Sequence, residues 1–249
     1  MSSRPLLVFD FDGVLVDGMA EYWWSSRRAA LGLDPSLVLP EQAPVGFARL
    51  RPLIHKGWEM VLVAAELARP GADPAAIEAD YAGALSAALA RSGWQPSLLQ
   101  AALEEVRRGA IASDRGRWLA LHRAYPGVPE RLLALSGEGA DWAVLTTKGA
   151  AFARELLAAL QLSPWRLYGH EQGSKAEVLL QLRGLGRPLW FIEDRRPTLE
   201  TILSTPGLEQ VRCFLAAWGY LGPGDRTALP PGIALLEPDR FAGPLAIWP

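Results

Sequence analysis

The chain contains 249 residues, of which 50% are hydrophobic, and it carries a net charge of -2 with a pI near 6.0. This composition is typical of a globular protein with a sizeable core, and it lacks the basic character with which nucleic-acid-binding proteins neutralise phosphates. The apolar runs are too short to cross a bilayer, and the first residues lack a signal-peptide pattern. We therefore expect a cytoplasmic protein with no nucleic-acid partner and no membrane partner.

The first predicted element is a short strand over residues 6–11. Its apolar run leads into Asp10 and Asp12, which are separated by one residue and followed by Gly13. Because residues i and i+2 of an extended strand share a face, both carboxylates are expected to point the same way. Such a pair repels itself unless a cation or a shared proton relieves the charge, and carboxylate oxygens suit Mg²⁺. The alternative interpretation is an acidic turn, since Asp-Gly is common in turns.

Residues 18–112 show no strand pattern and are predicted to form a helical subdomain. Alanine- and leucine-rich stretches alternate there with breaks that contain Pro and Gly, which delimit helices. Asp73 before Pro74 is typical of an N-cap followed by proline at the first helical position. Ser113 or Asp114 is expected to begin the helix that leads out of this block.

The rest of the chain alternates short apolar runs with helical patterns, which is typical of βαβ units and a parallel sheet. Further strands are predicted at residues 142–146, 166–169, 188–193 and 211–216, with helices between them such as 150–161 and 174–184. We predict an α/β fold with a Rossmann-like parallel sheet and helices on both faces. Residues 1–17 and 113–249 are expected to form this sheet domain, into which residues 18–112 are inserted as an all-helical domain.

Polar side chains follow several of the predicted strands, where functional residues of open parallel sheets gather. Thr146, Thr147 and Lys148 follow the second strand, and Glu193 and Asp194 end the fourth. Lys175 lies at the start of a predicted helix after the third strand, where the helix N-terminus favours an anion. These groups are therefore expected at the same edge of the sheet as the two N-terminal aspartates.

Lysine is rare in this chain. There are 22 arginines but only three lysines, Lys56, Lys148 and Lys175. An ammonium group approaches a phosphoryl oxygen as a compact point charge, whereas a guanidinium group is a planar fork. The three lysines are therefore candidates for positions where a compact positive charge is needed, although they could also be ordinary surface residues.

Together these segments resemble the four ordered motifs of the haloacid dehalogenase superfamily of phosphotransferases. The matching parts are residues 10–14 (Asp-Phe-Asp-Gly-Val), Thr146, Lys175 and the pair Glu193-Asp194. The helical block falls where that family places a cap domain. Residues 217–220 (Ala-Trp-Gly-Tyr) are similar to phosphoglycolate-phosphatase-type members.

The resemblance implies a Mg²⁺-dependent phosphatase that hydrolyses a small-molecule phosphate monoester through an aspartyl-phosphate intermediate. Asp10 would attack phosphorus, and Asp12 would act first as general acid and then as general base. Thr146, with Thr147 beside it, and Lys175 would hold the phosphoryl oxygens. A sugar phosphomutase using the same site, or a non-catalytic binding or scaffold protein, is the alternative.

The resemblance also implies a set of metal ligands, with one departure from the family pattern. The expected Mg²⁺ ligands are Asp10, Asp12 through its backbone carbonyl, Asp194 and Glu193. Thr198 stands where the family often has a second aspartate. We expect Glu193 to supply this acidic group, with Glu200 as the less favoured substitute.

The helical domain is expected to select the substrate. Arg51 and Lys56 precede an apolar helical run. Either could bind a substrate carboxylate or a second phosphate, and either could equally be a solvated surface residue.

Overall fold

The computed structural model describes residues 4–249, and the chain divides into two compact units. The first, here called the sheet unit, comprises the chain up to Asp17 and from Arg123 to Pro249; the second, the helical unit, is Gly18–His122. The first boundary lies where the sequence places it, whereas the expected boundary after residue 112 lies inside a helix of the helical unit. Residues 1–3 of the expected first segment lie outside the described residues.

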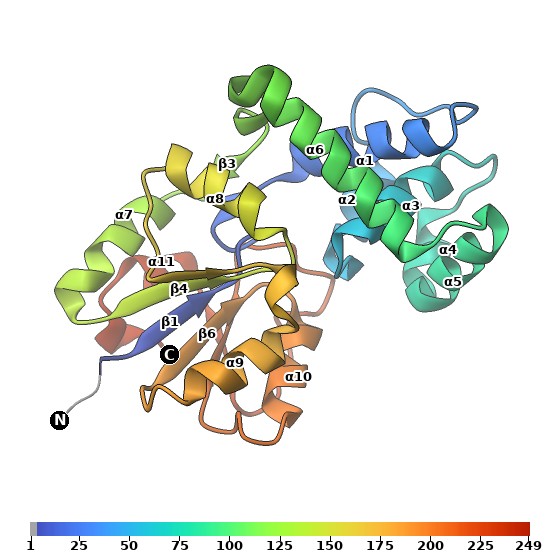
Figure 1. The fold of residues 1–249 in the computed structure, drawn as a ribbon. Helices are drawn as coiled ribbons and strands as arrows, with labels where there is room; N and C mark the ends of the chain where they lie inside the picture. Colours follow the sequence, from blue (N-terminus) through green and yellow to red (C-terminus); the bar gives the residue numbers. More distant parts are fainter. Residues whose placement is uncertain (1–3) are drawn as a thin grey trace. The chain divides into compact units, whose positions relative to one another are not determined.

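A six-stranded parallel sheet forms the centre of the sheet unit (Figure 1). In spatial order its strands are β5 (Arg166–Tyr168), β4 (Asp141–Leu145), β1 (Leu6–Phe9), β6 (Leu189–Glu193), β7 (Arg212–Ala216) and β8 (Ile233–Leu236). The predicted α/β class and the five predicted strands are confirmed. Strand β8, a run of four residues that completes the edge of the sheet beside β7, was not predicted.

The direction of strand addition reverses between β1 and β6. After β1 the chain adds β4 and then β5 on one side, and it later adds β6, β7 and β8 on the other side. In an open parallel sheet such a reversal opens a crevice beyond the carboxyl ends of the two central strands, where ligands bind. The ends of β1 and β6 are therefore the place in this fold where a site is expected.

Helices cover both faces of the sheet (Figure 1). The helices of the sheet unit are α7 (Val128–Ala134), α8 (Ala150–Ala159), α9 (Lys175–Arg183), α10 (Arg196–Ser204) and α11 (Pro238–Ala242), with the short 3₁₀ turns η2 (Leu135–Glu138), η3 (His170–Gln172) and η4 (Leu245–Ile247). Alternate strand residues such as Val8 and Phe191 pack with Val178 of α9 and Ile202 of α10 in one buried cluster.

The opposite face of the sheet is rich in aromatic side chains. Phe9 contacts Trp142 edge-on at 6.4 Å between ring centroids and Phe241 of α11 at 6.3 Å. Trp190 lies 5.9 Å from Trp248 near the C-terminus. These large rings bury much apolar area and fix the strands that position the site.

The helical unit contains only helices, as predicted, and all of its residues are described. Its elements are α1 (Met19–Leu33), α2 (Val45–Leu50), η1 (Arg51–Leu53), α3 (Gly57–Leu67), α4 (Pro74–Ala79), α5 (Tyr81–Ser92) and α6 (Pro96–Leu119). The Asp73 side chain caps α4 by accepting a hydrogen bond from the Ala75 amide, which confirms the predicted N-cap.

The course of helix α6 explains why the helical unit ends at His122 and not at residue 112 as predicted. Asp114 has non-helical backbone angles and its side chain accepts a hydrogen bond from the Arg117 amide, so a new helical segment does begin there. The break is only a kink, however, and helix continues on both sides of it. The chain therefore remains in the helical unit up to His122.

A two-stranded antiparallel ladder joins the two places where the chain of the sheet unit leaves for the helical unit and returns from it. It pairs β2 (Val16–Asp17) with β3 (Arg123–Ala124). The ladder was not predicted, since two residues are too few to produce a strand pattern.

None of the helices in the described part of the chain combines the length and the hydropathy needed to traverse a bilayer.

Candidate active site

Three carboxylates gather at the ends of the two central strands. Asp10 follows β1, Glu193 is the last residue of β6, and Asp194 comes next. One carboxylate oxygen from each lies within 4.8 Å of the others, and all three residues are buried. The reversal point of the sheet thus holds a concentration of negative charge that needs a positive partner.

Lys175 provides one such partner. It is the first residue of α9, whose start is fixed by a capping box between Ser174 and Glu177. Its ammonium nitrogen lies 2.9 Å from Asp10 Oδ1 and 2.5 Å from Glu193 Oε2. Burial alone would lower the pKa of Lys175, but the charges of these two carboxylates outweigh burial and raise the pKa above its usual value. The lysine therefore stays charged.

Asp10 has an unusual proton affinity for an aspartate. Burial, helped by the nearby charge of Glu193, raises its pKa to about 7, although Lys175 opposes the shift. For Glu193 burial also favours the neutral form, but Lys175 and hydrogen bonds from backbone amides outweigh it and lower the pKa. One ammonium therefore does not neutralise the cluster, and a further cation would favour the ionised form of Asp10.

In the absence of metal, Asp10→Asn is expected to stabilise the protein above pH 7 and to change its stability little near about pH 4. Folded Asp10 holds its proton up to about pH 7, whereas the unfolded residue releases it near 3.8. Wild-type stability therefore falls as the pH rises through this interval, and asparagine has no proton to lose. Thermal unfolding of both proteins in chelator across this pH range checks the result; a difference that is independent of pH would contradict it.

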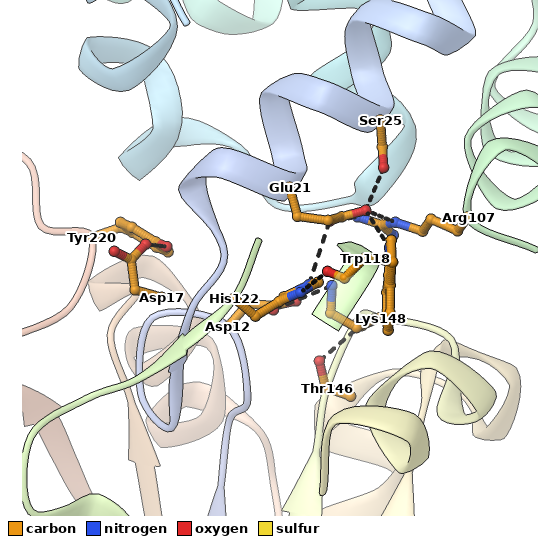
Figure 2. Close-up of polar contacts among 10 residues, drawn as sticks. All are labelled: Asp12, Asp17, Glu21, Ser25, Arg107, Trp118, His122, Thr146, Lys148 and Tyr220. Atoms are coloured by element: carbon orange, nitrogen blue, oxygen red, sulfur yellow. Dashed lines mark hydrogen bonds and ion pairs between the residues drawn. The ribbon is translucent and has the colours of Figure 1, made fainter. Parts of the chain in front are cut away.

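A second lysine lies beside Asp12, as Figure 2 shows. The Lys148 ammonium is buried and lies 3.3 Å from Asp12 Oδ1, while its backbone amide donates a 3.0 Å hydrogen bond to Thr146 Oγ1. The predicted residues Asp12 and Thr146 are thus linked through one turn after β4, with half-buried Thr147 inside it. Lys148 was expected at this edge as a candidate compact positive charge, on its rarity and its position after a strand, but its pairing with Asp12 was not predicted.

Glu193 and Glu200 differ clearly in their surroundings. Glu193 Oε2 accepts from Lys175, and Oε1 accepts from the amides of Asp194 and Arg195 at 3.1 and 3.0 Å. Glu200 instead pairs with Arg196 one helical turn away at 2.8 Å and is not part of the carboxylate cluster found among residues 4–249. Glu193 is therefore the acid that lies with Asp10 and Asp194, and it is already strongly hydrogen-bonded by protein donors.

Asp194 is held by the loop that follows β7. The backbone amide of Tyr220 donates a 2.8 Å hydrogen bond to Asp194 Oδ2. A Cβ atom on Gly219 would lie 2.2 Å from Asp194 Cβ, and one on Gly13 would lie 1.9 Å from Asp194 Oδ2. Gly13 also has φ of +95°, which favours glycine. Both glycines are needed so that backbone can approach this carboxylate closely.

Arg51 and Lys56 belong to the helical unit. The Arg51 guanidinium lies 5.0 Å over the Tyr22 ring and donates to the Ile54 carbonyl at 3.4 Å. Lys56 is exposed immediately before α3. Their suggested part in substrate selection stays a prediction.

No protein-family model and no curated protein sequence matches this chain. Several solved structures, however, are similar to it over most of their length. A predicted phosphatase from Clostridium acetobutylicum has a TM-score of 0.61 at 14% identity, covering 94% of each chain. A predicted phosphoglycolate phosphatase from Haemophilus somnus has a TM-score of 0.60 at 20% identity, covering 97% of this chain and 96% of that one. A haloacid dehalogenase-like family hydrolase from Streptococcus pneumoniae has a TM-score of 0.54 at 16% identity, covering 94% and 95%.

These likenesses extend over nearly the whole length of both partners, helical unit included. They show that the chain has the fold of haloacid dehalogenase-like hydrolases, so the family resemblance of the sequence is confirmed at the level of the fold. Because one fold serves several chemistries, the function must be argued from the site.

Proposed function

We propose that this protein is a Mg²⁺-dependent phosphatase that hydrolyses a small-molecule phosphate monoester through an aspartyl-phosphate on Asp10. The observation that carries the proposal is the joint burial of Asp10, Asp194 and Lys175 at the reversal point of the sheet. The fold shared with hydrolases described as phosphatases supports the same activity.

Asp10 is the proposed nucleophile. One of its carboxylate oxygens would form a bond to phosphorus as the bond to the ester oxygen breaks. Asp12 would donate a proton to the departing oxygen and later accept one from the water that attacks the phosphoenzyme. The Lys148 ammonium lies 3.3 Å from Asp12 Oδ1, and Lys175 would hold a phosphoryl oxygen at Asp10.

The donor set fits a magnesium ion. Carboxylate oxygens of Asp10, Asp194 and Glu193 lie within 4.8 Å of one another, and all three residues are buried. Asp10, Asp194 and the backbone carbonyl of Asp12 would hold the ion, with Glu193 as the additional acid. When bound, Mg²⁺ supplies positive charge that lets the carboxylate approach an anionic ester.

The proposal is tested by assaying purified protein against a panel of phosphate monoesters with and without Mg²⁺. Phosphate release that requires Mg²⁺ and stops in chelator is the expected result. Formation of an isomerised sugar phosphate without phosphate release would favour a phosphomutase. Absence of turnover on every ester, with Mg²⁺ bound, would overturn the enzymatic proposal and favour a binding or scaffold protein.

Gly219→Ala is expected to weaken Mg²⁺ binding by about tenfold or more, because the added methyl group must displace Asp194. Calorimetric titration of the metal-free protein with Mg²⁺ measures the affinity. Gly137→Ala is the matched control, since a Cβ atom at exposed Gly137 meets nothing within 4 Å. Equal affinities in the two variants would remove Asp194 from the proposed metal site.

A further inference from the structure

The segment that carries Asp12 is a tight loop between β1 and β2. The amides of Leu15 and Val16 both donate to the Phe11 carbonyl, at 2.9 and 3.0 Å, and the Gly13 amide donates to the Val16 carbonyl at 2.9 Å. The loop ends at Asp17, after which the chain enters the helical unit. The position of Asp12 therefore depends on how firmly residues 12–17 are held in the sheet unit.

One loop of the sheet unit binds this segment at two points. After β7, the Trp218 indole N–H donates a 2.9 Å hydrogen bond to the Val14 carbonyl. The Tyr220 hydroxyl donates a 2.5 Å hydrogen bond to Asp17 Oδ1, which is visible in Figure 2. A hydrogen bond to an ionised carboxylate is stronger than one between two neutral groups.

Tyr220 also contacts the proposed metal site through a different group. Its backbone amide donates to Asp194 Oδ2 at 2.8 Å, while its ring extends to Asp17. Gly219, next to it, lies against Asp194 and the Gly13 carbonyl so closely that no side chain fits. A single residue thus connects the carboxylate after β6 with the end of the segment that carries Asp12.

We propose that Tyr220 is a positioning residue that sets the place of Asp12 relative to the carboxylates of Asp10 and Asp194. This inference rests on the proposed function. The amide of Tyr220 holds Asp194, and the hydroxyl holds residues 12–17. Because the two contacts come from separate groups, they are separable: loss of the hydroxyl removes the hydrogen bond to Asp17, leaving Trp218 as the other contact to the segment, while the amide bond to Asp194 stays in place.

Tyr220→Phe tests the proposal, with kcat, the Mg²⁺ affinity and amide hydrogen exchange as readouts. We expect kcat to fall about tenfold, the loss set by one hydrogen bond to a charged group, while Mg²⁺ affinity stays unchanged. The amides of Leu15 and Val16 are expected to exchange faster. Tyr81→Phe is the matched control, because it removes a 3.0 Å hydrogen bond from a tyrosine hydroxyl to Glu59 within the helical unit.

Variants at Asp17 test the other end of the bond. Asp17→Ala is expected to reproduce the effects of Tyr220→Phe, and the double variant to add little to either single one. Asp17→Asn keeps an acceptor oxygen and should retain most of the wild-type kcat. The Asp17 variants also test the proposal if Tyr220→Phe fails to fold.

The outcomes separate the two proposals. If wild type hydrolyses esters but Tyr220→Phe and Asp17→Ala match it in kcat and in exchange, the positioning proposal is wrong. A fall in kcat equal to that of Tyr81→Phe, with unchanged exchange at residues 15 and 16, would also overturn it. If wild type turns over no ester, the proposed function fails, whereas hydrogen exchange still shows whether Tyr220 holds this segment.

Discussion

Asp10→Asn is expected to hydrolyse phosphate esters at least about a thousandfold more slowly than wild type. Asparagine keeps the size of the side chain but cannot form the acyl-phosphate bond. Its amide also cannot supply the negative charge that pairs with Lys175 and that the proposed metal ion would bind. Initial rates of phosphate release at saturating Mg²⁺ measure the effect.

Asp141→Asn is the matched control for this loss. Asp141 begins β4, so it lies at the opposite end of the sheet from the site, and it pairs with Arg187 at 2.6 Å on the surface. We expect its turnover to equal that of wild type, since surface ion pairs contribute little. Similar activity in Asp10→Asn and Asp141→Asn would show that the nucleophile lies elsewhere.

Arg107→Met is expected to destabilise the helical unit by about 3–5 kcal/mol. Arg107 and Glu21 form a fully buried pair, with two hydrogen bonds of 2.8 Å from the guanidinium to the carboxylate. Ser25 and the Trp118 indole also donate to Glu21 (Figure 2). Methionine fills a similar volume but leaves a buried carboxylate without its guanidinium. Urea unfolding followed by circular dichroism measures the loss.

The neighbouring residue offers a close control. Arg108 is 55% exposed and pairs with Glu104 and Glu105, so Arg108→Met should cost at most about 1 kcal/mol. The double variant Glu21→Gln, Arg107→Met should recover part of the stability, because it removes the unpaired charge. Equal losses in Arg107→Met and Arg108→Met would contradict the account of the buried pair.

Much of the fold follows from local patterns in the sequence. The five strands that were predicted are apolar runs bounded by polar residues, and the N-cap at Asp73 is a short-range signal that no distant contact alters. β8 escaped prediction because its four residues follow a Pro-Pro-Gly segment and gain their strand character from pairing with β7. The end of the helical unit at His122 was not predicted, because the sequence at the Asp114 kink resembles the start of a new helix.

The site was predictable where the residues stand at strand ends. Asp10, Lys175, Glu193 and Asp194 gather because parallel strands end at one edge of the sheet. The partner of each side chain was not predictable, since it depends on distances between segments far apart in the chain. Lys148 beside Asp12, and Tyr220 between Asp194 and Asp17, are of this kind.

The most direct test of the account is to locate the phosphoryl group on the protein during turnover. Asp12→Asn lacks both the proposed general acid and the proposed general base. With an aryl phosphate such as p-nitrophenyl phosphate, whose leaving group departs without a proton, the variant should still be phosphorylated in Mg²⁺, and its phosphoenzyme should accumulate until the reaction is quenched in acid. Peptide mass spectrometry is expected to find one phosphoryl group on Asp10. Consumption of the ester by wild type while Asp10 stays unmodified in the quenched variant, or a phosphoryl group on another residue, would contradict the mechanism.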